Sequence, residues 1–553
     1  MRTDPASTLG LARRLDWRFL LADLGLGRVV VTGAPDPVLI AALRRFAASV
    51  AVGSGGPADV AVACRPSPAE LRAAIRYVEP GGSIVVELFG RPRLRRSGRL
   101  TASSANAIAA RLRRDGFADV ATYWTWPDHA DGAEIVPLDD MPLIWQTLAR
   151  HRGARSSRLK ARLVRTLFLA GLGGAIIPAT TVVGRRPGPN AVSSAARSAP
   201  IIDAYLAANR GRLGLGRLVD GPTATLLITP RFQASAHVVG LVTPRRSGRP
   251  SVVVKVHRLA GFTRTLESEA ASLTALADLR PGGTAGVPRL LAHESIAGHA
   301  TIIETALAGR PLDPMEVRRD RSAAIEGVGS WLRGLRRMET PGSDDDRWER
   351  LILPALDALE AVLADEAVDA ERVRRARELV APLRAAELPV FIEHGDLSHP
   401  NLLLLDAGPP ARIGVVDWEL GEPRGLPLGD LLFFLGYVAI AERRPRTPEE
   451  HADAIEAAFG GPAAWAAAAA ARQADVEGID RALLGPLLVA TWTRALVRLL
   501  GRLDGNPDHR PGGAEIGADA DAATGRRLRG HRYHAIWRRV VEQASNVRWD
   551  IDD

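Results

Sequence analysis

Cysteine and lysine are scarce in this chain. Cys64 is the only cysteine among 553 residues, which excludes an internal disulfide framework and a cysteine-based zinc site. The only lysines are Lys160 and Lys255, so the 72 basic residues, set against 63 acidic ones, are almost all arginine. The arginines form short pairs rather than the clustered patch that nucleic acid requires. We therefore expect a folded protein of the reducing cytoplasm, without a nucleic-acid partner.

Long hydrophobic runs are also rare. Residues Met1 to Gly10 are polar and lack the apolar core of a secretory signal. The stretch Thr166–Gly184 is uncharged and long enough to span a bilayer in principle. Interior glycines and Pro178 divide it, and a β-branched run follows. We expect a buried helix, a turn and a strand there, not a membrane span.

The first part of the chain alternates short apolar runs with helical patterns, which is typical of α/β architecture. The expected strands are Arg28–Thr32, Asp59–Ala63, Ser83–Glu87 and Thr180–Val183. A segment rich in arginine, proline, glycine and serine follows, and its composition is that of a linker. We predict a Rossmann-like α/β domain over residues 1–186 and a linker over residues 187–198.

The pattern changes after the predicted linker. Three β-rich runs joined by turns predict an antiparallel sheet, and a long helix is expected from Phe262 to Leu279. A strand at Thr301–Glu304 precedes a mostly helical remainder. This order predicts an α+β domain with a sheet-containing lobe over residues 199–308 and a helical lobe over residues 309–553.

The strongest local motif is the run from His394 to Asn401, which reads His-Gly-Asp-Leu-Ser-His-Pro-Asn. Asp417 follows sixteen residues later, at the end of an apolar run. Phosphoryl transfer from ATP needs a group that accepts the proton of a hydroxyl, together with hard oxygen ligands for Mg²⁺. We predict that Asp396 is the catalytic base, that Asn401 and Asp417 bind Mg²⁺, and that His394 supports the loop.

A cation is expected near the nucleotide phosphates, with a carboxylate that positions it. Lys255 lies within a run of valines, in a chain that uses arginine almost everywhere else. Because an ammonium on a flexible stem differs from a guanidinium, its position is informative. Glu267 and Glu269 on the following helix are both candidates for its partner.

With these motifs, residues 199–553 resemble the aminoglycoside phosphotransferase and choline kinase family, which has a protein-kinase-like fold of two lobes. The resemblance implies a small-molecule kinase that uses ATP and Mg²⁺ and phosphorylates a hydroxyl of an aminoglycoside-, choline- or sugar-like acceptor. It favours Glu269 over Glu267 as the partner of Lys255. It also matches Asp430 to an aspartate that helps to close the helical lobe.

The same resemblance extends to the nucleotide site. Ile303 and Glu304 resemble the hinge whose backbone meets the adenine. The phosphate-covering loop of the family corresponds to residues 229–235, which contain no glycine. Backbone N–H groups and the hydroxyl of Ser235 could still approach a phosphate.

Residues 1–186 resemble class I S-adenosylmethionine-dependent methyltransferases, through the helix, Pro80-Gly-Gly turn and strand between Asp59 and Glu87. The turn Val31–Pro37 has one glycine and two prolines, and no acid follows the expected second strand at Val50–Ser54. A cofactor site of this type is expected to have a glycine-rich turn that lets the backbone approach the ligand, and an acid that binds the ribose hydroxyls. We therefore expect a degenerate methyltransferase-like fold without the cofactor site.

Two alternatives remain open. The kinase-like part could be a catalytically silent nucleotide-binding or scaffolding module, which the complete set of motif residues disfavours. The protein could also be a working methyltransferase with a regulatory kinase-like domain, which the turn at Val31–Pro37 disfavours.

Overall fold

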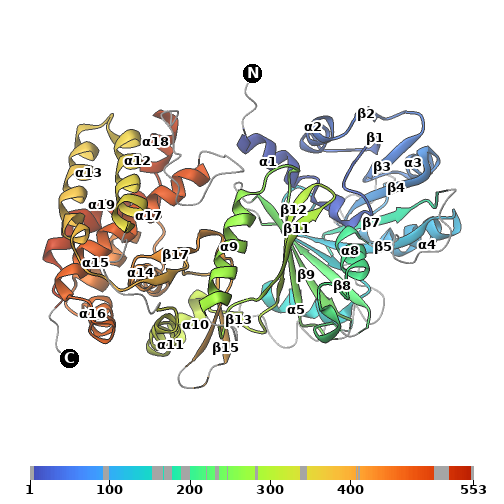
Figure 1. The fold of residues 1–553 in the computed structure, drawn as a ribbon. Coiled ribbons are helices and arrows are strands. Elements are labelled where there is room, and N and C mark those ends of the chain that lie inside the picture. The colour runs from blue at the N-terminus through green and yellow to red at the C-terminus, as the bar shows by residue number, and fades with distance from the viewer. Residues whose placement is uncertain are drawn as a thin grey trace. The chain divides into compact units, whose positions relative to one another are not determined.

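The computed structural model describes the chain apart from residues 1–4, 91–98, 152–165, 167–176, 189–199, 220, 231–235, 246, 280–283, 337–345, 407, 409–410, 504–521 and 550–553. The chain divides into two units (Figure 1). The first unit consists of Met1–Phe262 and Leu291–Ala306, and the second of Thr263–Leu290 and Leu307–Asp553. The second unit therefore begins at the long helix that the sequence predicts.

A 12-stranded sheet forms the centre of the first unit, in the order β11-β12-β10-β9-β8-β6-β5-β7-β4-β3-β1-β2. Its strands are β1 (Arg28–Gly33), β2 (Ser49–Val52), β3 (Ala58–Cys64), β4 (Val78–Phe89), β5 (Ala118–Trp126), β6 (Glu134–Pro137), β7 (Ala179–Arg185), β8 (Thr223–Ile228), β9 (His237–Pro244), β10 (Val252–His257), β11 (Leu290–Ile296) and β12 (His299–Thr305). All the strands that the sequence predicts in this part of the chain are present.

Strands β2, β1, β3 and β4 are parallel to one another. A helix crosses between β1 and β2 and another between β3 and β4, as the alternating pattern predicts. Strand β7, which contains the predicted run Thr180–Val183, is antiparallel to both β4 and β5. The arrangement at this end of the sheet is therefore α/β with an antiparallel strand added. The remainder of Thr166–Gly184 lies mostly outside the described residues.

The sheet continues from the first segment of the chain into the second. Strand β6 pairs with β8 through Glu134 opposite Ile228 and Ile135 opposite Leu227. Strands β8, β9, β10 and β12 follow as antiparallel neighbours, as expected for the sheet-containing lobe. The compact units thus differ from the predicted division at residues 187–198, because backbone pairing joins the predicted α/β domain to the predicted lobe.

Helices cover both faces of this sheet. The helical elements are α1 (Pro5–Arg13), η1 (Asp16–Leu20), α2 (Pro37–Phe46), α3 (Pro68–Tyr77), η3 (Ala102–Ser104), α4 (Ala105–Arg114), α5 (Met141–His151), α8 (Ile201–Ala208) and η5 (Leu215–Arg217). Apolar side chains of η1, α2 and α8 pack on one face of the sheet and form a core with strand residues from β1 to β12. Those of α3 and α4 pack on the opposite face.

The second unit is mainly helical. Its helical elements are α9 (Arg264–Leu279), α10 (Pro314–Arg319), α11 (Arg321–Arg333), η6 (Trp348–Ile352), α12 (Leu353–Leu363), α13 (Ala367–Val380), η7 (Ala381–Arg384), η8 (Trp418–Leu420), α14 (Gly429–Arg443), α15 (Pro448–Phe459), α16 (Trp465–Glu477), η9 (Arg481–Leu483), α17 (Leu484–Leu503), α18 (Ala522–Arg529), α19 (Arg532–Gln543) and η10 (Ala544–Asn546). Two short sheets join β13 (Arg310–Pro311) to β15 (Leu402–Asp406) and β16 (Arg412–Val415), and β14 (Phe391–Glu393) to β17 (Glu422–Gly425).

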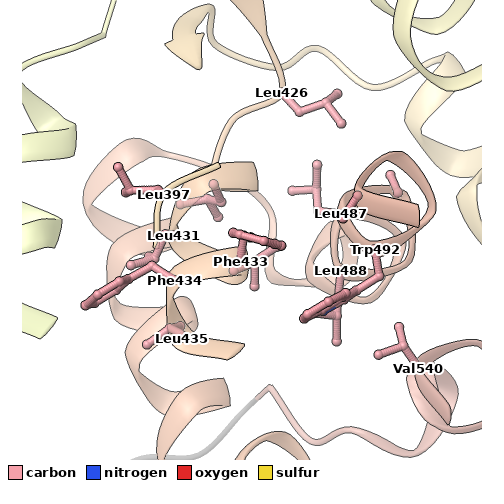
Figure 2. Packing of buried hydrophobic residues seen from close by; sticks show 14 of the residues in the cluster. Leu397, Leu426, Leu431, Phe433, Phe434, Leu435, Leu487, Leu488, Trp492 and Val540 are labelled. Carbon is pink, nitrogen blue, oxygen red and sulfur yellow. The ribbon is translucent and has the colours of Figure 1, made fainter. Parts of the chain in front are cut away.

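The core of this unit holds the elements that carry the catalytic motif. Phe433 of α14 lies between its own helix and α17, where its ring is 5.4 Å from that of Trp492 (Figure 2). Leu397 of the motif belongs to the same apolar cluster. Burial of such side chains contributes roughly 1.5–3 kcal/mol each. The motif loop is therefore attached to the main core of the unit by one of its own residues.

One helical stretch among the described residues, Arg481–Leu500, is long and apolar enough to cross a membrane. It is 83% buried within the fold. Burial to this extent is what the central helix of a helical core requires, and Trp492 in this stretch belongs to that core.

Candidate active site

The motif loop runs from the end of β14 to the start of β15, and one carboxylate holds its beginning. Asp430, in the first turn of α14, accepts the backbone N–H of His394 at 2.6 Å and that of Gly395 at 2.8 Å. Asp430 is 5% exposed. Burial, together with the nearby carboxylate of Glu393, raises the pKa of Asp430. Asp430, which the sequence matches to an aspartate that helps to close the helical lobe, thus holds the first two residues of the motif loop in place.

Gly395 occupies a position that needs glycine. Its φ is +85°, in a region that residues with a side chain rarely adopt. A Cβ atom there would lie 2.7 Å from the carbonyl oxygen of Leu420. Arg498 of α17 donates to the carbonyl oxygen of Gly395. The glycine of the motif therefore allows the loop to pack closely against Leu420 and Arg498.

Asp396 and Asn401 belong to one hydrogen-bonded turn. The Asn401 side-chain nitrogen donates to the carbonyl oxygen of Asp396 at 3.1 Å. The Ser398 hydroxyl donates to Oδ1 of Asp396 at 3.2 Å, and the Asn401 N–H donates to the Ser398 carbonyl oxygen at 2.8 Å. Asp396 is half-buried, whereas Asn401 is 5% exposed. The five-residue spacing thus places both groups on the same rigid turn.

The loop is also bonded to the segment that carries Asp417. The Nε2–H of His394 donates to the carbonyl oxygen of Val416 at 3.0 Å, and the Val416 N–H donates to that of Asn401 at 3.0 Å. Nδ1 of His394 accepts the Asp396 N–H at 3.2 Å. His394 therefore supports the loop, as the sequence predicts, because it bridges the turn of Asp396 to the residue that precedes Asp417.

Asp417 adopts a left-handed conformation, with φ of +71°. Such a conformation is uncommon for a residue with a side chain and often marks a functional position. The next residue, Trp418, is fully buried and donates its indole N–H to Val415 at 3.1 Å. Its ring meets that of His394 edge to face, with the centroids 4.7 Å apart.

Glu269 lies on α9 and is fully buried. Its Oε1 accepts the backbone N–H of Trp418 at 3.0 Å. This bond links α9 to the residue after Asp417, although 149 residues separate the two in the chain. Glu267, the other candidate for the partner of Lys255, is not among the buried residues of the helix. The choice of Glu269 over Glu267 as the inward-facing glutamate is consistent with this burial.

Sequence reasoning did not identify an ion cluster behind the loop. Glu393, which is 3% exposed, accepts two bonds from Arg494, at 2.7 and 2.6 Å, and one from Arg498 at 3.2 Å. Burial alone would raise the pKa of Glu393, but the charges of Arg494 and Arg498 lower it. The only signal in the sequence is a glutamate in a short apolar strand and arginines in an apolar helix.

Lys255 and Glu304 lie in the first unit, on adjacent strands β10 and β12. Val254 pairs with Ile303 and faces the main core of the unit, so Lys255 and Glu304 share the opposite face of the sheet. Lys255 is 5% and Glu304 2% exposed. The pairing places them as diagonal neighbours. Ser235 lies outside the described residues.

The predicted residues therefore fall into two groups. Hydrogen bonds join Asp396, Asn401 and the segments around Asp417 and Glu269 within the second unit. Lys255 and Glu304 belong to the first unit.

Residues 232–471 match the model of the phosphotransferase enzyme family. This segment contains both groups of site residues. The match confirms the expected class of enzyme, a small-molecule kinase. No curated protein matches the chain. The family match does not reach residues 1–186, so the methyltransferase resemblance stays a prediction.

Three solved structures illustrate the similarity. An aminoglycoside phosphotransferase from Streptomyces rimosus, in complex with ADP and streptomycin, is 18% identical, covers 45% of this chain and 90% of its own, and gives a TM-score of 0.30. A choline/ethanolamine kinase family protein from Mesorhizobium loti is 17% identical. The match covers 61% of this chain and 99% of that protein, with a TM-score of 0.31. Aminoglycoside phosphotransferase APH(4)-Ia is 14% identical. The match covers 60% of this chain and 99% of that protein, with a TM-score of 0.36.

Proposed function

We propose that this protein transfers the γ-phosphoryl group of ATP to a hydroxyl group of a small molecule. One observation carries the proposal. The turn that positions the carboxylate of Asp396 also positions Asn401, and it is bonded through Val416 to the segment of Asp417. Phosphoryl transfer depends chiefly on positioning and charge stabilisation. In this proposal the turn provides the base and one oxygen ligand, and the segment bonded to it provides the second ligand.

In this proposal Asp396 orients the acceptor hydroxyl and accepts its proton as the new O–P bond forms. Its position suits that role, because the carboxylate is half-buried and the backbone around it is held by Asn401 and Ser398. His394 donates with Nε2 and accepts with Nδ1, so it keeps the turn in place without taking part in proton transfer. The leaving group is ADP.

The residues fit a magnesium ion. The side-chain nitrogen of Asn401 is engaged by the carbonyl oxygen of Asp396, which leaves its amide oxygen available as a hard ligand. Asp417 supplies a carboxylate from the adjoining segment, and Mg²⁺ prefers such oxygen ligands. When bound, Mg²⁺ would neutralise the charge on the phosphates.

The nucleotide would lie against residues of the first unit. We propose that Lys255 contacts the α- and β-phosphates with Glu269 as its partner, and that the backbone beside Glu304 meets the adenine. Ser235 is proposed to approach a phosphate from its loop. The burial of Lys255 in a β-strand supports this role, because a buried ammonium needs an anionic partner. The acceptor is proposed to be an aminoglycoside-, choline- or sugar-like molecule.

Release of ADP, measured over a set of hydroxylated acceptors, tests the proposal with the full chain. Asp396→Asn should lower turnover by roughly 10²–10⁴-fold, the usual contribution of a positioned base, and should leave ATP binding unchanged. Asp406→Asn, at an exposed position on β15, is the matched control and should retain full activity. Equal turnover in the Asp396 and Asp406 variants would show that the base is wrongly assigned. Nucleotide binding without turnover on any acceptor would favour the silent module.

We further propose that residues 1–186 do not bind S-adenosylmethionine, although the sequence between Asp59 and Glu87 resembles that of a methyltransferase. Ligands of α/β sheets bind beyond the carboxyl ends of strands where the strand order reverses, here between β1 and β3. At that end Arg14 donates to both oxygens of Glu87, each at 2.7 Å, and to Asp36 at 2.8 Å. The side chains of Arg14 and Glu87 are 3% and 1% exposed.

The turn after β1 also supports this proposal. A Cβ atom on Gly33 would lie 2.1 Å from the carbonyl oxygen of Cys64, so the turn is closed against β3. Ala34 donates its N–H to the same oxygen at 2.7 Å. Calorimetric titration with S-adenosylmethionine should therefore give no heat of binding. A measurable affinity would revive the methyltransferase alternative.

A further inference from the structure

The first unit contains a pocket that the proposed kinase reaction does not use. Its volume is about 390 Å³, within the range of small-molecule sites. Residues 119–123 of β5 form one wall, and Asp203 and Ala207 of α8 form another. Thr223 and Thr225 of β8 complete it. All these residues belong to the same unit.

Carboxylates dominate the charge of this pocket. Asp119, Asp139 and Asp203 line it together with one cation, Arg245. Arg245 is already paired with Asp139 at 3.0 Å, with side chains 37% and 67% exposed. An anionic ligand would meet repulsion from Asp203, whereas a cation would be attracted.

The two carboxylate oxygens of Asp203 differ in their hydrogen bonds. The hydroxyls of Thr225 and Thr223 both donate to Oδ1, at 2.7 and 3.3 Å. Among the residues that the structure describes, none donates to Oδ2. Burial raises the pKa of Asp203 despite these bonds, because a carboxylate charge out of water needs compensation. An ammonium group in the pocket would provide both the missing donor and the charge.

Tyr123 supplies an independent indication of a ligand. It lines the pocket and is 5% exposed. In the described parts of the chain no group hydrogen-bonds to its hydroxyl, so this oxygen is available to a molecule that enters the pocket. Burial, with the nearby charges of Asp203 and Asp139, raises the pKa of Tyr123, so that it remains a neutral donor and acceptor.

We propose that this pocket binds a small organic cation that carries a primary ammonium group. The ammonium group donates to Oδ2 of Asp203, and the Tyr123 hydroxyl completes its hydrogen bonds with the same molecule. The site is distinct from the residues assigned to ATP and Mg²⁺, and the proposal does not depend on the kinase reaction.

Calorimetry with the full chain tests this proposal, with putrescine as the probe and 1,4-butanediol as an uncharged molecule of the same length. Putrescine should bind at one site, and 1,4-butanediol should not bind. Asp203→Asn should weaken putrescine binding at least tenfold, and Tyr123→Phe should weaken it several-fold. Asp23→Asn, at an exposed aspartate of the same unit, is the matched control and should bind like the unaltered protein.

A second variant separates loss of binding from loss of folding. Ala207 is exposed on α8 and lines the pocket, so Ala207→Phe should fill the space without removing a hydrogen bond. Putrescine binding should disappear while the melting temperature stays unchanged. The proposal is overturned if putrescine does not bind, if 1,4-butanediol binds equally well, or if Asp203→Asn and Asp23→Asn bind putrescine alike.

Discussion

Arg494 forms an ion pair with Glu393 in which one nitrogen, Nη1, donates to both carboxylate oxygens, to Oε1 at 2.7 Å and to Oε2 at 2.6 Å. The two side chains are 7% and 3% exposed. Glu393 immediately precedes His394 in the chain. The pair therefore fixes the end of β14 at the point where the motif loop begins, and α17 takes part in the candidate site without contributing a catalytic group.

Loss of this pair should destabilise the second unit. Arg494→Met leaves Glu393 buried with incomplete compensation, for which the expected loss is about 3–5 kcal/mol of unfolding free energy. Denaturant unfolding of the full chain measures it. Arg374→Met, which removes an exposed arginine from α13, should change the unfolding curve little. If Glu393→Gln combined with Arg494→Met is no more stable than Arg494→Met alone, uncompensated charge is not the cause.

Lys255 and Glu269 should act as a pair. Lys255→Met and Glu269→Gln should each weaken ATP binding at least tenfold, and the double variant should be little worse than either. Glu269→Gln keeps an oxygen that can accept the N–H of Trp418, so folding should be preserved. Titration with ATP and Mg²⁺ measures all four proteins. Fully additive losses would mean that the two side chains do not interact.

Lys255→Arg offers a separate test of the proposed contact. A guanidinium is planar and larger than an ammonium, so it should not replace Lys255, which is buried on β10. We expect ATP binding as weak as that of Lys255→Met. Restored binding in Lys255→Arg would indicate that only the charge matters.

Asp417 should determine the magnesium requirement. Asp417→Asn removes a charged oxygen ligand, so the Mg²⁺ concentration for half-maximal turnover should rise at least tenfold, with little change in KM for the acceptor. Asp396→Asn should instead lower kcat at every Mg²⁺ concentration. Initial rates over a Mg²⁺ series distinguish the two. An unchanged Mg²⁺ dependence in Asp417→Asn would contradict its assignment as a ligand.

Arg14→Met should produce a stability defect that depends on pH. In the unaltered protein, Arg14 outweighs the effect of burial and lowers the pKa of Glu87, so the pair stabilises the fold above about pH 4.3, the ordinary pKa of a glutamate. Without Arg14, burial would raise that pKa and destabilise the fold at neutral pH. The loss should be about 3–5 kcal/mol at pH 7 and should shrink as the pH falls toward 5. Denaturant unfolding at both pH values measures this, and an equal loss at both would contradict it.

The grouping of the motif residues was largely predictable because it depends on local sequence. The spacing of Asp396 and Asn401 corresponds to one turn, and Asp417 follows a short apolar strand that is bonded to this turn, while the chemical roles of the three residues stay predictions. Lys255 was visible because a lysine among valines is conspicuous in a chain rich in arginine. Helical periodicity alone did not distinguish Glu269 from Glu267; the family resemblance favoured Glu269, and the burial of Glu269 is consistent with that choice.

The remaining features depend on contacts between distant parts of the chain. Glu393 and Arg494 are 101 residues apart, and neither has a local pattern that points to the other. The pairing of β6 with β8 involves short strands from different predicted domains. Strand β7 was predicted as a strand, but its antiparallel direction depends on the neighbours that it finds in the sheet.

The shared sheet has a practical consequence for anyone who shortens this protein. A chain that begins at residue 199 would lack β6, and the outer edge of β8 would then present backbone N–H and C=O groups that pair with Glu134 and Ile135 in the intact protein. Uncovered strand edges recruit other chains. The isolated kinase segment should thus be prone to self-association, even though every residue assigned to its chemistry would still be there.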